Sequence, residues 1–464
     1  MQVFQELFDN YRHYHVTDIS TNRFLVENYH RLLDELARSY CVHEVGKSVE
    51  GRPIKSITIG NGPVKVLMWS QMHGNESTAS RAILDILQFL NEPGDLAMLQ
   101  QNILNRVTIC IMPMLNPDGA VLFHRRNALN IDINRDAREF ESPEAQILKA
   151  VLADFKADYA FNLHDQRRFY NISGSGKPST IAFLAPAYNK AGQVNPSREK
   201  AMALIAYLRQ ELEKFIPGQV GIYDDTYAPR AFGDYTQNTG ASTILVEAGW
   251  EPNDMEKEYV RKLNFCLLMA ALDKIAENST NQFTLADYQA IPVNDERLFD
   301  LLIRNATVVK QGKQYKIDIG IHRYEHNTEQ PSDYFTKGEI SDIGDLKEWY
   351  GFEEINGSEL IASPGLVLQE PYKELEEVTR VRSVELVKQG ILYVPILREI
   401  TLTYVELPVN IVSAGYTPSA IPIVEGTANL LLKSLSGELE YVIINGFLWK
   451  LGEAQPDSIH GLVL

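Results

Sequence analysis

The sequence predicts an α/β domain, with a mixed, largely parallel sheet and helices on both faces, followed by a mainly β C-terminal domain. Between residues 64 and 277, short apolar runs alternate with amphipathic segments of helical period, a pattern typical of sheets covered on both faces. After residue 280 that period fades and short β-type runs dominate. With 464 residues the chain is too long for one ordinary domain. We therefore expect a first domain over residues 1–280 and a second over residues 281–464.

The elements of the first domain follow from its apolar runs and from the turn and capping residues between them. One or two helices are expected before Tyr40, and an antiparallel pair of strands between Cys41 and Gly60. The segments expected next are strand 64–70, helix 78–90, strand 106–114, helix 141–155, strand 158–166, strand 181–187, helix 196–215, strand 242–249 and helix 256–276. Ser77 or Thr78 is placed to cap the first helix of this series.

The second domain is expected from β-type runs that Pro, Gly and Asn residues separate. These runs are 300–309, 314–321, 391–397, 399–407 and 440–449. A polar stretch at 323–354 is interpreted as an inserted segment. We expect no catalytic group in this domain.

Composition excludes several classes of partner. The net charge of −17 argues against nucleic acid or an anionic membrane as the main partner. No apolar run approaches transmembrane length, and the first residues lack the basic and apolar parts of a secretory signal. Cys41, Cys110 and Cys266 are interpreted as reduced thiols, two of them in apolar runs. We expect a cytoplasmic location, and nothing in the sequence indicates an oligomeric state.

The sequence His73-Gly74-Asn75-Glu76 lies where an expected strand ends and a helix begins. Open α/β sheets bind ligands at such strand ends. Imidazole nitrogen and carboxylate oxygen are ligands of catalytic zinc, which keeps one coordination position open. Alone, this spacing is also typical of a capped turn with a solvated Glu. A third zinc ligand should come from another strand end, and His164 follows the apolar run of strand 158–166.

Glu247 follows another buried apolar run, Thr243 to Val246. A carboxylate at this place must be paired, be neutralised or face a polar cleft. Beside a metal it could accept a proton from the attacking water and pass it to the leaving amine. The alternative is a Glu that bridges to an Arg of a nearby loop.

The loop between Phe123 and Asp136 is rich in Arg and Asn. Its cationic and amide side chains are Arg125, Arg126, Asn127, Asn134 and Arg135. A charge run is usually a solvated face, but this one follows a strand end and could point into the crevice. Arginine there could stabilise an oxyanion or hold a carboxylate with two hydrogen bonds.

The motifs GKSVEGRPI, HGNE, NPDG, RRNALNIDINRD, NLHD and ILVEAG occur in this order between Gly46 and Gly249. In this respect the sequence resembles the zinc carboxypeptidase (carboxypeptidase A-like) family. The resemblance implies one Zn²⁺ per chain, and it implies a role for each of the following residues: His73, Glu76 and His164 as zinc ligands, Glu247 as general base and acid, Arg125 as the oxyanion residue, and Asn134 and Arg135 as binders of the substrate's terminal carboxylate.

The chain departs from the digestive members of this family in two respects. The 88 residues from Glu76 to His164 resemble more the spacing of the succinylglutamate desuccinylase and aspartoacylase relatives. The mobile Tyr of the digestive enzymes has no secure match: Tyr223 and Tyr227 are candidates, and Tyr227 is preferred. Arg230 could clamp substrate or pair with a nearby Asp.

Three functions are compatible with these residues. The first is a zinc metallocarboxypeptidase that removes a C-terminal residue from a peptide. The second is an amidohydrolase that acts with the same metal chemistry on an N-acyl amino acid or a cell-wall peptide fragment. The third is a peptide-binding module without activity, which the complete set of three ligands and Glu247 argues against.

Overall fold

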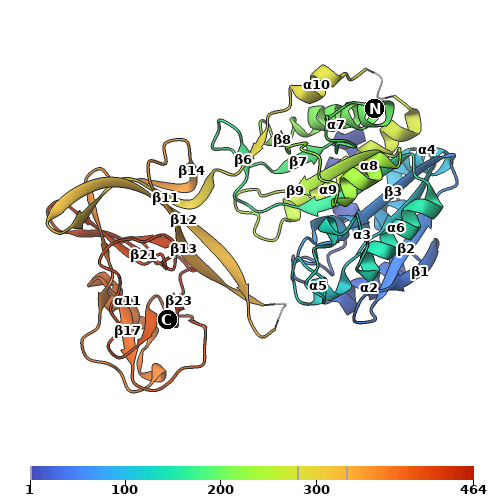
Figure 1. Cartoon of the computed structure of the whole chain (residues 1–464). Coiled ribbons are helices and arrows are strands. Elements are labelled where there is room, and N and C mark those ends of the chain that lie inside the picture. The colour runs from blue at the N-terminus through green and yellow to red at the C-terminus, as the bar shows by residue number, and fades with distance from the viewer. Residues whose placement is uncertain (1–2, 280–281, 331–332) are drawn as a thin grey trace. The chain divides into compact units, whose positions relative to one another are not determined.

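The computed structural model describes residues 3–279, 282–330 and 333–464, and the chain forms two compact units, Met1–Glu296 and Arg297–Leu464 (Figure 1). The domain boundary expected at residues 280 and 281 lies outside the described residues. The segment after it still belongs to the first unit, because the Tyr288 hydroxyl accepts a hydrogen bond from the Ala185 N–H at 3.1 Å.

The first unit is built on an eight-stranded sheet with the order β1-β2-β4-β3-β5-β9-β7-β8. The strands β4, β3, β5 and β9 run parallel to one another. The pairs β1–β2, β2–β4 and β9–β7 are antiparallel. The strands of this unit are β1 (Cys41–Lys47), β2 (Pro53–Ile59), β3 (Val64–Ser70), β4 (Val107–Met112), β5 (Tyr159–Asp165), β6 (Asn171–Ile172), β7 (Ile181–Leu184), β8 (Val220–Ile222), β9 (Ser242–Ala248) and β10 (Asn294–Asp295). The expected mixed, largely parallel α/β fold is confirmed.

Helices cover both faces of this sheet. They are α1 (Val3–Asn10), α2 (Val26–Leu36), α3 (Thr78–Asn91), α4 (Ala97–Arg106), α5 (Pro117–Val121), α6 (Pro143–Phe155), α7 (Pro196–Leu212), α8 (Phe232–Asn238), α9 (Glu258–Glu277) and α10 (Leu285–Gln289), with short 3-10 turns at Tyr11–His13, Gly94–Leu96 and Ile133–Arg135. Successive side chains of a strand point to opposite faces. In β3, Val66 and Met68 therefore join the core beneath α3, α7 and α9, while Leu67 and Trp69 join the core beneath α6 and α8.

The second unit is mainly β, as expected. Its largest sheet has the order β13-β12-β11-β15-β20-β21-β22, and β14 also pairs with β11. The elements of this unit are β11 (Leu298–Lys310), β12 (Lys313–Asn327), β13 (Tyr334–Gly344), β14 (Tyr350–Asn356), β15 (Leu360–Pro364), β16 (Leu366–Val367), a 3-10 turn at Leu375–Glu377, α11 (Arg380–Lys388), β17 (Ile391–Ile396), β18 (Tyr404–Val405), β19 (Asn410–Ser413), β20 (Leu430–Ser434), β21 (Leu439–Ile444), β22 (Phe447–Lys450) and β23 (Gly461–Leu462). The interpretation of residues 323–354 as an insertion was wrong, because β12, β13 and β14 are members of this sheet.

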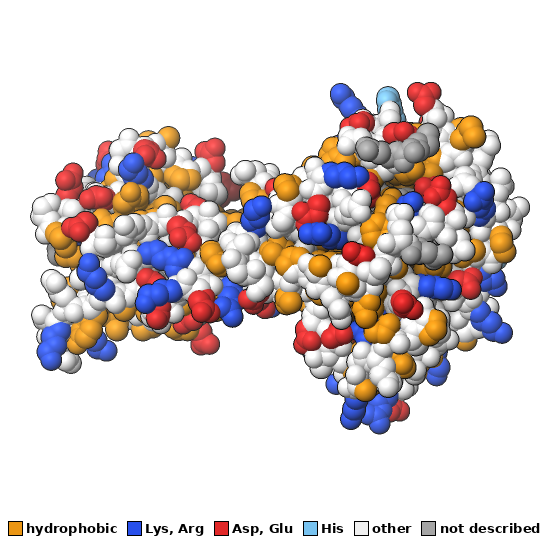
Figure 2. Space-filling view, turned by 90° about the horizontal axis from the view of Figure 1, so that it is seen from above, with side chains coloured by type: hydrophobic (Ala, Val, Ile, Leu, Met, Phe, Trp, Pro, Cys, Tyr) orange, Lys and Arg blue, Asp and Glu red, His pale blue; other side chains and the backbone are white. Residues whose placement is uncertain are grey.

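The surface carries both signs of charge. Figure 2 shows acidic and basic side chains interspersed over the visible face. Within the described residues, no helix has both the length and the apolar composition needed to cross a membrane. The cytoplasmic location stays a prediction.

Candidate metal centre

The carboxyl ends of three neighbouring parallel strands hold the predicted site. His73 and Glu76 lie in the loop that joins β3 to α3, and His164 and Glu247 are the penultimate residues of β5 and β9. The parallel register places His164 directly opposite Glu247. The apolar runs that form these buried strands therefore deliver all four side chains to one edge of the sheet.

A close approach of two backbones shapes the loop that bears His73 and Glu76. A Cβ atom on Gly74 would lie 2.0 Å from the carbonyl carbon of Gly119, so only glycine fits at this position. The sequences HGNE and NPDG thus meet in space. Asn116 caps α5 there, accepting the Gly119 N–H at 2.9 Å.

His73, Glu76 and His164 form a compact buried cluster. The Nδ1 atom of His73 lies 2.8 Å from Glu76 Oε1, and the Nδ1 atom of His164 lies 2.8 Å from Glu76 Oε2. One potential ligand atom from each residue lies within 4.8 Å of the others. Two imidazole nitrogens and a carboxylate are a ligand set that suits zinc and leaves a position open for water or substrate. The residues predicted from sequence as ligands are therefore brought together and suit a metal site.

A second carboxylate, Asp132, supports this cluster and was missed in the sequence. Its Oδ1 atom lies 3.1 Å from His73 Nε2, and its Oδ2 atom accepts the Arg125 Nε–H at 3.1 Å. A carboxylate on the far nitrogen of a ligating histidine fixes the ring orientation and its tautomer. The only signal in the sequence was an acidic residue within an Arg- and Asn-rich loop, which is too common a pattern to interpret.

The charges of the cluster support one another. Burial alone would raise the pKa of Glu76, but the two neighbouring histidines outweigh it and hold that pKa well below its usual range. For His73, burial acts in the opposite direction and would lower the pKa, but the negative charges of Glu76 and Asp132 outweigh it, so that the pKa is raised. For His164, burial prevails over Glu76 and lowers the pKa. Glu76 is thus ionised, as a metal ligand must be.

Glu247 behaves differently from Glu76. Its pKa is raised well above the usual value, first by burial and then by the negative charges of Glu76 and Asp165. The cations nearby are engaged elsewhere: Arg125 pairs with Glu76 and Asp132, and Lys257 pairs with Asp165. The geometry therefore favours a carboxylate that can take up a proton beside the cluster.

The Arg- and Asn-rich loop divides between the site and the surface. Arg125 reaches Glu76 Oε1 at 3.1 Å while its side chain stays 45% exposed. Asn134 is buried, its Nδ2 atom 3.3 Å from His164 Nε2, and its Oδ1 atom accepts the Phe232 N–H. Arg135 is exposed, and its Nη1 donates to the Asn134 carbonyl.

The remaining members of this loop face away from the cluster. Arg126 donates to the Asn130 carbonyl at an exposed position, and buried Asn127 binds Glu144 at 2.9 Å. Arg230 donates its Nε–H to the carbonyl of Arg135 at 2.8 Å, which places it at the edge of the loop rather than in an ion pair with a nearby Asp.

Of the two candidate tyrosines, Tyr223 is influenced by the charges of the cluster. Its pKa is strongly raised, first by burial and then by Glu247, and also by Tyr170 and Glu76. The rings of Tyr223 and Tyr170 lie 5.4 Å apart. Tyr227 is partly exposed, next to Ala228, whose N–H binds Asp234. The sequence preference for Tyr227 thus gains no support from these contacts.

Comparisons with known proteins agree with this site. Residues 28–176 match the model of the zinc carboxypeptidase family. Carboxypeptidase SOL1 of Arabidopsis thaliana is 27% identical over 180 residues, which cover 32% of this chain and 36% of the relative. Carboxypeptidase 2 of Trichophyton rubrum is 33% identical over 147 residues, which cover 28% of this chain and 26% of the relative.

The matched segment therefore spans only about a quarter to a third of the length of these curated relatives. Among solved structures, a metallo-carboxypeptidase from Burkholderia cenocepacia has 21% sequence identity and a TM-score of 0.45, covering 56% of this chain and 71% of that one.

Proposed function

The chain belongs to the zinc carboxypeptidase family, and on this premise we propose that it is a zinc-dependent metallocarboxypeptidase that hydrolyses the C-terminal peptide bond of a peptide. One observation carries the proposal. The buried cluster of His73, Glu76 and His164 lies beside Glu247, which forms no ion pair with a Lys or Arg among the described residues.

We assign one Zn²⁺ per chain to the two Nδ1 atoms and the Glu76 carboxylate. The donors fit, because they combine nitrogen and oxygen, are buried, and have a supporting carboxylate on His73. Zinc at this position would polarise the scissile carbonyl and lower the pKa of a neighbouring water.

The chain's own residues supply the other steps. Glu247 takes a proton from the attacking water and transfers it to the leaving amine, which its raised pKa favours. Arg125, held at the cluster's exposed side, stabilises the negative oxygen that develops on the scissile carbonyl.

Substrate binding is assigned to the loop beside the cluster. Asn134 and Arg135 hold the terminal carboxylate of the substrate. Arg230, fixed on the Arg135 carbonyl, is a further binding candidate. Tyr227 and Tyr223 are alternatives for a phenol that contacts the substrate. Each of these roles is testable by substitution with unchanged zinc content.

The same residues could also hydrolyse an N-acyl amino acid or a cell-wall peptide fragment. In both cases the scissile bond is an amide next to a carboxylate, so the metal, Glu247 and Arg125 would act alike. The acyl side of the substrate distinguishes the two functions.

Elemental analysis and a substrate panel test the proposal. We expect one zinc per chain in the purified protein, and release of a free amino acid from N-blocked dipeptides and longer peptides. His73→Ala should lose metal and activity while the fold remains. Hydrolysis of N-acyl amino acids alone would favour the second function, and full zinc occupancy in His73→Ala would contradict the ligand assignment.

A further inference from the structure

A lysine next to the metal centre connects the strand ends that carry its functional residues. We infer that Lys257 is a positioning residue that fixes the end of β5, which carries His164, relative to the end of β9, which carries Glu247. This inference rests on the proposed function, because it assigns a role within the same site. Lys257 itself does not touch the cluster of His73, Glu76 and His164.

The ammonium group of Lys257 bonds to both strand ends at once. Its Nζ atom lies 3.2 Å from Asp165 Oδ2 and 3.4 Å from the Gln166 carbonyl, both at the end of β5. The same atom donates to the Ala248 carbonyl, at the end of β9, at 3.0 Å. An ammonium has three donors in compact geometry, and here each has an acceptor.

The loop that bears His73 and Glu76 and the start of α3 also contact Asp165. The Thr78 hydroxyl, at the first residue of α3, donates to Asp165 Oδ2 at 2.5 Å, so that it shares this oxygen with Lys257. The Asp165 backbone N–H in turn donates to Glu76 Oε2 at 3.2 Å. All three chain segments that supply the site thus meet at the Lys257–Asp165 pair.

This pair lies largely out of solvent. The side chains of Lys257 and Asp165 are only 13% and 9% exposed. Asp165 Oδ1 is buried and has no hydrogen-bond partner among the described residues, so the hydrogen bonds of this carboxylate are made by its other oxygen. Without the ammonium, a buried negative charge would remain one residue from His164, and Thr78 would be its one side-chain partner in the part of the chain that the structure describes.

The backbone presents Lys257 in an unusual conformation. Lys257 has φ +52°, in the left-handed region that residues with a Cβ rarely adopt. Such a conformation persists only when the surrounding contacts hold it. Asp254 provides some of them, because its carboxylate accepts the N–H groups of Glu258, Tyr259 and Val260.

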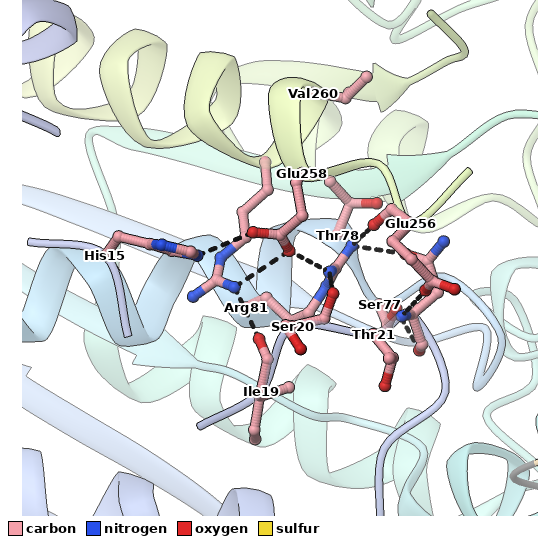
Figure 3. A network of polar contacts seen from close by, with 12 residues as sticks. His15, Ile19, Ser20, Thr21, Ser77, Thr78, Arg81, Glu256, Glu258 and Val260 are labelled. Atoms are coloured by element: carbon pink, nitrogen blue, oxygen red, sulfur yellow. Dashed lines mark hydrogen bonds and ion pairs between the residues drawn. The ribbon is translucent and has the colours of Figure 1, made fainter. Parts of the chain in front are cut away.

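A polar network holds the rest of this segment, as Figure 3 shows. Arg81 of α3, fully buried, donates to the Glu256 carbonyl and to Glu258 Oε1, each at 2.6 Å. His15 lies 2.8 Å from the other oxygen of Glu258. Helix α3, which follows the loop bearing His73 and Glu76, therefore anchors the residues on either side of Lys257.

These contacts define what Lys257 contributes. The proton transfer requires Glu247 at a fixed distance from the metal ligands. The pairing of β5 with β9 ends just beyond these side chains, where Asp165 pairs with Ala248 and the Gln166 N–H donates to the Ala248 carbonyl at 3.0 Å. Lys257 continues the connection beyond the sheet through two carbonyls and a carboxylate. Its loss should change the separation of Glu247 and His164 without changing the residues that hold the substrate's carboxylate.

The test compares Lys257→Met with the wild-type protein loaded with zinc. We expect kcat on a cleaved peptide to fall about 10- to 100-fold and KM to change less than about threefold, the range typical of residues that support metal ligands. Chelator competition should show zinc affinity weakened about 10-fold. Lys55→Met is the matched control, because Lys55 has a 17% exposed side chain and an ion pair with Asp34 in a different part of the unit. It should leave kcat and zinc affinity unchanged.

Chemical rescue separates positioning from general stability. Lys257→Cys treated with 2-bromoethylamine regains an ammonium at the original distance, and most of the lost kcat should return. Wild-type protein treated in the same way controls for alkylation of exposed Cys41. This comparison with the untreated Cys variant also carries the test if Lys257→Met does not fold.

Two results would overturn the inference: unchanged kcat and zinc affinity in Lys257→Met, or a rescue that restores the melting temperature but not kcat. A wild-type protein that binds zinc but cleaves no peptide would instead contradict the proposed function. The zinc affinities would still test Lys257 in that case.

Discussion

His73 Nε2 lies 3.1 Å from Asp132 Oδ1, while the Nδ1 atom of the same ring faces Glu76. The two ring nitrogens thus have different partners, and a proton on Nε2, hydrogen-bonded to Asp132, would leave the Nδ1 lone pair for a metal. Arg125 bonds to both carboxylates and connects them.

Asp132→Ala should therefore weaken zinc binding by roughly 10- to 100-fold, because His73 loses the partner that orients it. Chelator competition measures this affinity. Asp132→Asn is the matched variant: it keeps an oxygen that can accept the His73 N–H, and should lose less affinity than Asp132→Ala. Equal zinc affinity in both variants and in the wild type would contradict this role.

Glu247→Gln separates a catalytic carboxylate from a structural one. The amide keeps the shape of the side chain but cannot accept a proton at neutral pH, so kcat should fall by at least about 10²-fold. Melting temperature and zinc content should stay close to wild type, since Glu247 forms no ion pair with Arg125 or Lys257. A large drop in stability, with activity in proportion to the folded fraction, would favour the structural role.

Tyr223→Phe and Tyr227→Phe test which phenol belongs to the site. Because Tyr223 lies close enough to Glu247 and Glu76 for their charges to raise its pKa, its hydroxyl should contribute to substrate or transition-state binding. Loss of one hydrogen bond of about 1.4 kcal/mol corresponds to a roughly 10-fold lower kcat/KM. Tyr227→Phe should change kcat/KM less than about threefold. The opposite order would restore the preference for Tyr227.

The strands that carry the site could be predicted because each is an apolar run that ends at a polar residue. That pattern identifies β3, β5 and β9, and with them the positions of His73, His164 and Glu247 at one sheet edge. Asp132 and Lys257 could not be predicted in this way. They lie outside the regular elements, and their partners are 59 and 92 residues away in the chain.

The second unit was predicted in class but not in detail. The polar composition of residues 323–354 suggested an insertion, yet β12 and β13 form a long antiparallel pair there. Most side chains of β13 and of residues 323–327 in β12 are only partly buried, so side-chain burial does not impose the apolar alternation by which strands are recognised. The attachment of the short helix α10 to the first unit also depends on a distant contact, that of Tyr288 with Ala185, which no local sequence pattern reveals.

Asp234 supplies a prediction about pH. Burial raises its pKa to about 6, although the Ala228 N–H and the charges of Arg198 and Arg135 oppose this effect. The pKa of Asp234 in the folded protein therefore exceeds its value of about 3.9 in the unfolded chain. At a pH between these two pKa values, the folded state carries a proton on Asp234 that the unfolded state has lost. The contribution of Asp234 to the unfolding free energy must fall as pH rises from about 4 to 6 and stay low above that.

Asp234→Asn removes this titration and keeps an oxygen that can accept the Ala228 N–H, which lies 2.9 Å from the carboxylate. Relative to wild type, the variant should gain up to about 3 kcal/mol of unfolding free energy between pH 4 and pH 7, since each pKa unit corresponds to about 1.4 kcal/mol. Urea denaturation of both proteins across this range measures the difference. Asp154→Asn, at an exposed position of α6, removes the same charge and is the matched control for the substitution itself. A constant difference between Asp234→Asn and wild type at every pH would contradict the raised pKa of Asp234.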